Sequence, residues 1–277
     1  MSGELDRYDS EVDVVSSATA LAMHGLFNPA GPAPSTGDAL PPLWHWLAFL
    51  PRVPQGELGP DGHPRRHAVT RPEMYPQRMF AGARVSFHGV ARIDYPLTRT
   101  SRVVSQIEKS GRSGALLIVT VENKIECEGE LAIIETQDIV YRSLSGPVEN
   151  DSDELSVIPE SEWIWKMDLS LESTLLFRFS ALTYNAHRIH YDRRYAMNEE
   201  GYPGLVVQGP LQALGLLEVV RRSTRDRLVS KFEFRSMRPV FDGGTLHLRA
   251  QPTSSKVDMA AYDHLGRRTM AASAEFS

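Results

Sequence analysis

The chain has 277 residues, which is long for one domain and comfortable for two. Its formal net charge of −5 excludes the basic face that a general nucleic-acid surface needs, and its single cysteine, Cys127, excludes an internal disulfide framework and a cysteine metal cluster. The first 20 residues lack a secretory signal, and no apolar run approaches the roughly 20 residues that span a bilayer. We therefore expect a cytoplasmic protein with no nucleic-acid or membrane partner.

The first predicted elements are two helices. Apolar residues recur at helical spacing from Val12 to Leu26, so an amphipathic helix should end before Asn28. After a loop over residues 28–42, an apolar stretch over residues 42–50 predicts a short buried helix that begins at a proline. His45 lies in this stretch without a second polar group, so we expect it in a core or a pocket wall.

Residues 51–78 are rich in Pro, Gly, His and Arg, which predicts a long irregular segment. Loops of this length are usually functional or disordered. His63 and His67 suggest a metal site, but only Asp61 accompanies them, and we expect no metal there. The basic residues are better suited to line an entrance for a phosphorylated ligand.

The hydrophobic period changes to two from Arg84 to Arg142, which predicts antiparallel strands. The expected strands cover residues 85–91, 116–121 and 131–134, with a turn at residues 128–130 before the last. Residues 143–172 read as an acidic connector between two β-rich halves. We therefore expect one domain over residues 1–148 and a second over residues 149–277.

A polar cluster in the second half is the main candidate for a functional site. The apolar run over residues 176–181 predicts a strand, and the sequence Thr-Tyr-Asn-Ala-His-Arg-Ile-His-Tyr-Asp follows it at residues 183–192. An unperturbed histidine has a pKa of about 6.5, so the neutral imidazole of His190 can accept a proton from water at neutral pH.

The cluster is followed by a predicted helix that begins at Gly209-Pro210 and is apolar on nearly every face, as a buried helix is. The free N–H groups and positive dipole end at its N-terminus suit an oxyanion hole, and Gly209 permits close approach of a ligand oxygen. Period-two patterns then predict strands over residues 228–238, 246–250, 257–262 and 268–276, with turns at residues 242–244 and 266.

Residues 173–222 resemble the MaoC-like (R)-specific enoyl-thioester hydratases and dehydratases of the hotdog fold. Their motif has Asp, any residue, Asn, Pro, an aliphatic residue and His, and a further acid two residues on. The corresponding residues here are Asn185, His187, Arg188, Ile189, His190 and Asp192. This variant resembles the hydroxyacyl-thioester dehydratase type 2 branch, which includes mesaconyl-C4-CoA and itaconyl-CoA hydratases.

The resemblance implies an α+β double hotdog, with two antiparallel sheets each wrapped around a central helix. A faint similarity between the halves agrees with this, since Pro42-Leu43 and Pro210-Leu211 both open apolar helices. The first half has no counterpart of Asn185 or His190, so we expect one active site per chain, with the first half shaping the acyl pocket. A homodimer of double hotdogs is a further expectation.

The resemblance also implies a hydratase/dehydratase of an α,β-unsaturated acyl-CoA, with a C4–C5 dicarboxylic acyl group such as mesaconyl or itaconyl as the best single prediction. By the match to the motif, His190 is the base and Asn185 holds the water, while Gly209 N–H stabilises the enolate oxygen. The expected substrate-binding residues are Tyr184, His187, Arg188, Asp192, Val207 and Gln208. Because the CoA thioester is the substrate, no cofactor or metal is expected.

Three questions stay open at this point. Asn185 cannot carry a proton as the family Asp can, so either His190 performs all proton transfer or His187 or Asp192 assists it. The free carboxylate of the acyl group could be bound by Arg178, Arg188, Arg193 or Arg194. The alternative functions are a 3-hydroxyacyl-thioester dehydratase of fatty-acid or polyketide synthesis and a non-catalytic acyl-thioester-binding protein.

Overall fold

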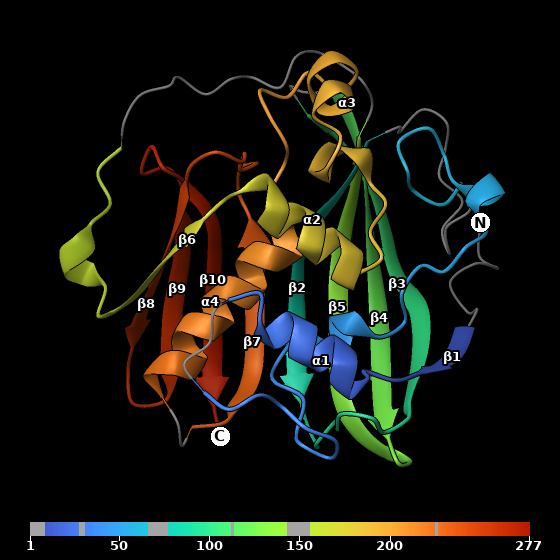
Figure 1. Cartoon of the computed structure of the whole chain (residues 1–277), viewed down its shortest axis with the longest axis vertical. Helices are drawn as coiled ribbons and strands as arrows, with labels where there is room; N and C mark the ends of the chain where they lie inside the picture. Colours follow the sequence, from blue (N-terminus) through green and yellow to red (C-terminus); the bar gives the residue numbers. More distant parts are fainter. Residues whose placement is uncertain (1–8, 28–30, 66–76, 112–113, 143–155, 225–226) are drawn as a thin grey trace.

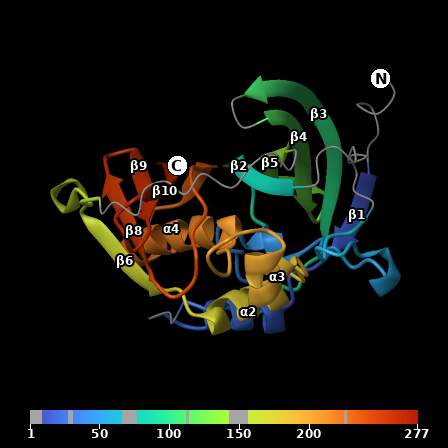
Figure 2. The same cartoon turned by 90° about the horizontal axis from the view of Figure 1, so that it is seen from above.

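The computed structural model describes residues 9–27, 31–65, 77–111, 114–142, 156–224 and 227–277. In these residues ten antiparallel strands form one sheet, and the helices α1, α2 and α4 lie on its concave side (Figures 1 and 2). The predicted α+β class with antiparallel strands is confirmed, and the strands of the two halves join edge to edge in one continuous sheet. The expected domain boundary between residues 148 and 149 lies outside the described residues.

The described residues of the first half contain five strands, one α-helix and two 3₁₀ helices (η). They are β1 (Asp9–Asp13), α1 (Ser17–His24), η1 (Trp44–Leu47), η2 (Gln55–Glu57), β2 (Gln77–Phe87), β3 (Leu97–Gly111), β4 (Gly114–Cys127) and β5 (Glu130–Arg142). The predicted strands over residues 116–121 and 131–134 lie inside β4 and β5, and the predicted turn between them is confirmed. Glu128 and Gly129 both have positive φ there, which is the backbone of a tight hairpin.

The second half contains the remaining strands and helices. They are η3 (Glu160–Glu162), β6 (Trp165–Ser170), α2 (Ser173–Leu182), η4 (Arg188–His190), α3 (Arg193–Asn198), α4 (Gly209–Ser223), β7 (Val229–Ser236), β8 (Thr245–Pro252), β9 (Lys256–Tyr262) and β10 (Arg268–Phe276). The four strands predicted after the buried helix are all present, and α4 begins at Gly209 with proline in its first turn, as predicted.

The two halves repeat one topology. The strand order across the sheet is β1-β3-β4-β5-β2-β7-β10-β9-β8-β6, so each half places its first strand at the outer edge and its second strand at the centre. The halves meet where β2 pairs with β7. At this junction a Cβ on Gly82 would lie 2.4 Å from the carbonyl oxygen of Phe234, so only glycine fits the close approach of the two strands.

Helix α4 is the buried helix of the second half. Every residue from Leu211 to Val220 is buried, and the helix packs against β6, β8, β9 and β10. A Cβ on Gly215 would lie 2.8 Å from a methyl carbon of Leu248, which shows how closely the helix approaches β8. This packing fixes the position of the helix N-terminus relative to the sheet.

The strand predicted over residues 176–181 is wrong, because these residues belong to α2. Leu175, Leu176 and Phe179 are buried, whereas Phe177 is 63% exposed. Burial at positions i, i+1 and i+4 is the pattern of a helix face and not of a strand. The polar cluster therefore follows the end of a helix.

The two predicted helices of the first half also differ from the structure. Val12 lies in the edge strand β1 and is 65% exposed, and the helix is limited to α1, which Ser16 caps by accepting a hydrogen bond from Thr19 N–H. The helix predicted over residues 42–50 is reduced to the single turn η1, with Leu43 and Phe49 at positive φ on either side of it. Among the residues of the first half that the structure describes, no helix is as long as α4.

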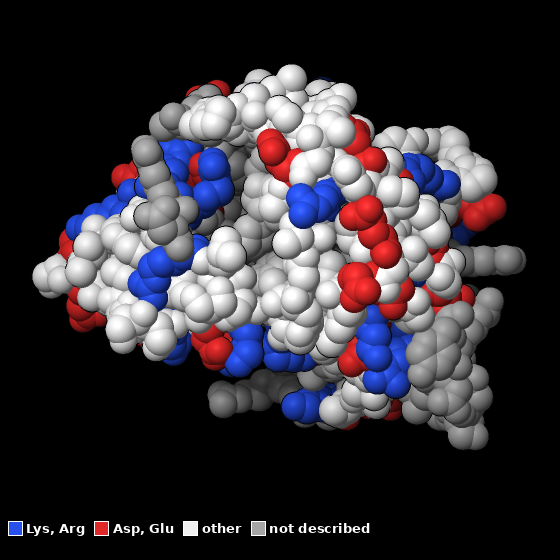
Figure 3. Space-filling model, turned by 90° about the horizontal axis from the view of Figure 1, so that it is seen from below, with Lys and Arg blue, Asp and Glu red and all other residues white. Residues whose placement is uncertain are grey.

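No helix among the described residues is long and apolar enough to cross a membrane. On the face drawn in Figure 3, Lys and Arg side chains are interspersed with Asp and Glu side chains. This face therefore lacks the continuous basic surface on which general nucleic-acid binding depends.

Candidate active site

A cavity of about 540 Å³ is lined by both halves of the chain. Its apolar wall includes Trp46, Phe80 and Phe179. Its polar lining includes Asn185, His187, His190, Gln208 and Gly209 from the second half, and Asp61, His63 and Arg78 from the first. The volume is typical of a pocket for a small organic ligand.

His190 lies in η4 at the wall of this cavity and is 8% exposed. Its Nδ1 is 2.7 Å from the carbonyl oxygen of Val206, so Nδ1–H donates and Nε2 keeps its lone pair. Burial lowers the pKa of His190 to about 4, although the hydrogen bond to Val206 acts in the opposite direction. The ring is therefore neutral at pH 7, as a general base must be.

Asn185 holds the loop between α2 and η4. Its backbone N–H donates to the carbonyl oxygen of Ser180 at 2.8 Å, and its Oδ1 accepts the N–H of His187 at 3.0 Å. This contact from a side chain to the backbone two residues later is an Asx turn. Because Oδ1 is engaged, the amide NH₂ is the end of Asn185 that can donate to a ligand in the cavity.

His187 lies between two other histidine rings. The ring of His63 is tilted by 40° relative to it with centroids 4.0 Å apart, and the ring of His190 meets it edge-on at 5.3 Å. Burial, followed by the charges of His63 and His190, lowers the pKa of His187 to about 2. His187 is therefore a neutral imidazole over the whole working range of pH.

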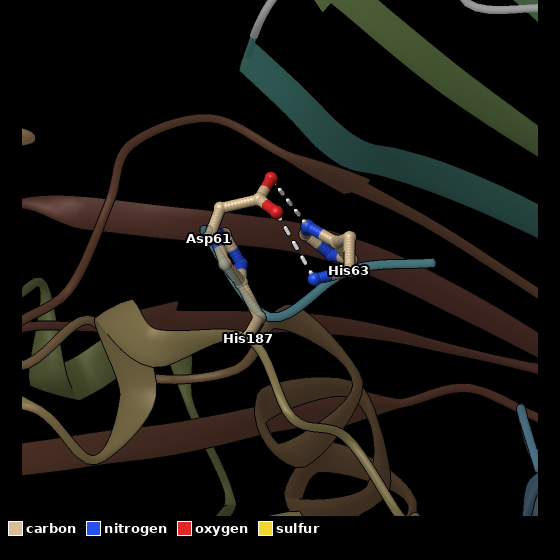
Figure 4. A group of neighbouring side chains, drawn as sticks. All are labelled: Asp61, His63 and His187. Carbon is tan, nitrogen blue, oxygen red and sulfur yellow. Dashed lines mark hydrogen bonds and ion pairs between the residues drawn. The ribbon is translucent and has the colours of Figure 1, made fainter. Parts of the chain in front are cut away.

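Asp61 and His63 bring the first half into the site (Figure 4). Asp61 Oδ2 is 3.2 Å from Nδ1 of His63, and Asp61 Oδ1 accepts the N–H of His63. Burial acts to raise the pKa of Asp61, but the hydrogen bond and charge of His63 outweigh it and hold the pKa well below its usual range. The Asp61 side chain is thus an ionised partner of His63.

The loop that carries these residues rests directly on the polar cluster. Arg188 N–H donates to the carbonyl oxygen of Asp61 at 2.9 Å, and its side chain donates to the carbonyl oxygen of Pro60 at 3.0 Å. Gly62 has a φ of +88°, and a Cβ there would lie 1.8 Å from the carbonyl oxygen of Ala186. Glycine is therefore required at this position for two reasons, the positive φ of the backbone and the close approach to the Ala186 carbonyl.

The start of α4 presents backbone donors to the same cavity. Gly209 is the first residue of the helix and lines the cavity, where the positive end of the helix dipole favours developing negative charge. Gln208 is 1% exposed, and its NH₂ donates to the carbonyl oxygen of Leu176 and to Oγ of Ser180. These hydrogen bonds of Gln208 connect the start of α4 to α2.

Three residues expected to bind substrate do not line the cavity. Tyr184 is 58% exposed with a φ of +49°. Arg188 and Asp192 form an ion pair at 2.7 Å, and the Arg188 guanidinium covers the ring of Tyr195. Val207 and Gln208, by contrast, do line it. The arginine pair with Asp192 stabilises the loop and is directed away from the cavity lining.

The arginines expected to meet a substrate carboxylate also lie elsewhere. None of Arg178, Arg188, Arg193 and Arg194 lines the cavity, and Arg193 pairs with Asp242. The cavity is lined instead by Arg78 of β2 and by Arg238, which follows β7. Neither was predicted from the sequence to meet the substrate carboxylate, because nothing local distinguishes them from the other arginines of the chain.

Asp61, His63 and His187 are the residues in the described part of the chain that could hold a metal ion, since their ligand atoms lie within 4.8 Å of one another. Two imidazoles and a carboxylate are a donor set that suits zinc and similar ions. The predicted partner His67 lies outside the described residues. The segment of residues 51–78 was predicted from its length to be functional or disordered, but its contact with the histidine cluster, more than a hundred residues later in the chain, was not predicted.

Comparisons with known proteins agree on one family. The family model for hydroxyacyl-thioester dehydratase type 2 matches residues 43–242. A mesaconyl-C(4)-CoA hydratase of Chloroflexus aurantiacus is 44% identical over 271 residues, which are 98% of this chain and 96% of that protein. A mitochondrial hydroxyacyl-thioester dehydratase type 2 of Schizosaccharomyces pombe is 25% identical over 247 residues, covering 78% of this chain and 79% of that protein.

The solved structures extend the likeness to the fold. A MaoC-like dehydratase from Phytophthora capsici superposes with a TM-score of 0.74, covering 99% of this chain and 96% of that one. At 13% sequence identity this likeness shows a shared MaoC-like hotdog fold, and nothing about substrate.

Proposed function

The chain belongs to the hydroxyacyl-thioester dehydratase type 2 family and is a hydratase/dehydratase of acyl thioesters, and we propose that it hydrates a C4–C5 dicarboxylic enoyl-CoA, with mesaconyl-C4-CoA as the best candidate. The identity of 44% over almost the full length of both proteins is the observation that carries this substrate. The reaction adds the oxygen of water to the β-carbon of the enoyl thioester and a proton to its α-carbon.

We propose that His190 is the base. Its Nε2 has a lone pair because Nδ1–H is held by Val206, and the ring is neutral at pH 7 because it is buried. Nε2 takes a proton from water as the oxygen bonds to the β-carbon, and the double-bond electrons move to give an enolate. The imidazolium that results then returns the proton to the α-carbon, so that His190 ends neutral.

Asn185 and Gly209 take the two supporting roles in this proposal. The amide NH₂ of Asn185 donates to the water and orients it, which an amide does as well as a carboxylic acid. The N–H of Gly209 donates to the thioester oxygen, where negative charge develops in the enolate, and the dipole of α4 adds to this effect. All proton transfer is thus assigned to His190.

We further propose that the two five-stranded repeats are the hotdogs of a double hotdog. The repeated strand order supports this, and so does the place of α4 in the chain, after β6 and before β7. The first repeat contributes walls of the cavity and no counterpart of His190. A homodimer of these units and a cytoplasmic location remain predictions, which the mass in solution and the distribution of a tagged chain in cells would test.

We propose that the reaction needs no metal or other cofactor. The short contact between His63 and Asp61 gives the cluster of Asp61, His63 and His187 a role in hydrogen bonding that requires no ion. Activity that survives treatment with EDTA and dialysis would support this proposal. Loss of activity that zinc restores would contradict it.

The test of the proposed function is the loss of enoyl absorbance with mesaconyl-C4-CoA and crotonyl-CoA, for the wild type and for His190→Ala. Removal of a general base typically costs about 10²–10⁴-fold in turnover. If the folded variant keeps more than about a third of wild-type turnover, His190 is not the base. Binding of the thioesters without hydration in the wild type would favour the non-catalytic alternative.

A further inference from the structure

We propose that the guanidinium of Arg78 binds the free carboxylate of the substrate acyl group, so that Arg78 selects dicarboxylic over monocarboxylic enoyl thioesters. This inference rests on the proposed function and adds the residue that determines its substrate class. It concerns an arginine of the first half, on the strand where the two halves of the sheet meet.

The location of Arg78 satisfies the first requirement for this role. Arg78 lies near the start of β2, opposite Tyr141 of β5, and lines the cavity together with His187 and His190. Arg78 and the proposed base thus line one cavity, so a ligand bound there can contact both.

The second observation concerns the charge of Arg78. Among the residues that the structure describes, no acidic side chain pairs with its guanidinium, and its Nε has no hydrogen-bond partner. Other arginines differ in this respect, since Arg84 on the same strand pairs with Asp138 at 2.7 Å. A guanidinium that lines a cavity and has no carboxylate partner among the described residues is suited to pair with the anionic group of a ligand.

The acids that line the same cavity are already engaged. Asp61 is held by His63, and Glu200 accepts a hydrogen bond from the hydroxyl of Tyr195 at 3.0 Å. The two arginines near the polar cluster, Arg188 and Arg193, have their own carboxylate partners. Among these groups, Arg78 is the one with a donor in need of an acceptor.

The chemistry of a dicarboxylic enoyl thioester fits this arrangement. In a mesaconyl-C4 group the free carboxylate is bonded to the carbon that accepts the water oxygen. Its partner must therefore lie in the same cavity as the base, and Arg78 lines that cavity. A guanidinium and a carboxylate can form two parallel hydrogen bonds, which would also fix the orientation of the double bond relative to His190.

The test compares two thioesters in three proteins: the wild type, Arg78→Met and Arg84→Met. Methionine keeps the length of the side chain without its charge, and Arg84 is a matched control on the same strand, half-exposed and outside the cavity. Because breaking a buried charge pair is costly, Arg78→Met should lower kcat/KM for mesaconyl-C4-CoA by about 30-fold or more. Its kcat/KM for crotonyl-CoA should change by less than about threefold, and Arg84→Met should leave both values unchanged.

A binding measurement separates the failure of this inference from the failure of the proposed function. Succinyl-CoA and butyryl-CoA, which have no double bond to hydrate, report carboxylate recognition without turnover. Calorimetry should show that Arg78→Met weakens the binding of succinyl-CoA and leaves that of butyryl-CoA unchanged. Equal losses for both thioesters, or no loss for either, would overturn the role of Arg78. A wild type that hydrates crotonyl-CoA but not mesaconyl-C4-CoA would overturn the proposed substrate instead.

Discussion

Protonation of His190 should couple the stability of the fold to pH. The pKa of the imidazole is about 6.5 in an unfolded chain and about 4 in the folded protein. Because the folded-state pKa is lowered, the stabilisation is fully present above pH 6.5 and is lost as the pH falls towards 4. Acid therefore favours the unfolded chain, which binds the proton more readily.

The size of the effect follows from these two values. At pH 5 the imidazole is almost fully protonated in the unfolded chain, but only about one-tenth protonated in the folded protein. Proton linkage then gives a loss of about 2 kcal/mol in the free energy of unfolding between pH 8 and pH 5 from His190 alone. His187, with a folded-state pKa of about 2, should contribute a loss of similar size.

Urea unfolding of the wild type and of His190→Gln at pH 8 and pH 5 measures this directly. Glutamine does not titrate, so the variant should lose about 2 kcal/mol less than the wild type over this range, whatever its stability at pH 8. An equal loss in both proteins would show that His190 is not a buried neutral imidazole. The reasoning that makes it a base of low pKa would then be refuted.

Three further predictions follow from the site. Asn185→Asp keeps the acceptor for His187 N–H, so the variant should stay folded and active. Its carboxylate should move the acid limb of the pH–rate profile upward from about pH 4, and an unmoved limb would show that position 185 does not face His190. Gly62→Ala should lower turnover about tenfold or more because the new Cβ meets the carbonyl of Ala186, whereas Gly56→Ala, with open space around it, should not lower it. Equal activity of the two variants would show that the position of this loop does not affect the site. A fragment of residues 150–277 should be insoluble or inactive because it exposes β7 and loses Trp46 and Phe80 from the cavity. A soluble, fully active monomer of this fragment would contradict the proposed double hotdog.

The sequence carried enough information to locate the second half of the site. Proline after Gly209, followed by an apolar run, is a local signal, and it predicted the start of α4 correctly. The turn at Glu128-Gly129 was also predicted from the local sequence, and both residues have positive φ in the structure. Features that depend on a few neighbouring residues could thus be predicted from the sequence.

Features that depend on contacts between residues distant in the sequence could not be predicted. The apolar run before the polar cluster is compatible with a strand or a helix over so few residues, and only the burial of Leu176 and Phe179 on one side identifies α2. Asp61 and His63 join the site through the contact between Gly62 and Ala186, which no local pattern encodes. The pKa of His190, about 6.5 for a free imidazole, falls to about 4 because folding buries the ring.

The central claim is that this chain adds water to a dicarboxylic enoyl-CoA with His190 as the base. Mass spectrometry of mesaconyl-C4-CoA incubated with the purified chain tests it most directly. The wild type should convert the thioester into a product heavier by one water, and folded His190→Ala should not. An unchanged thioester with the folded wild type, or equal product from both proteins, would contradict the account.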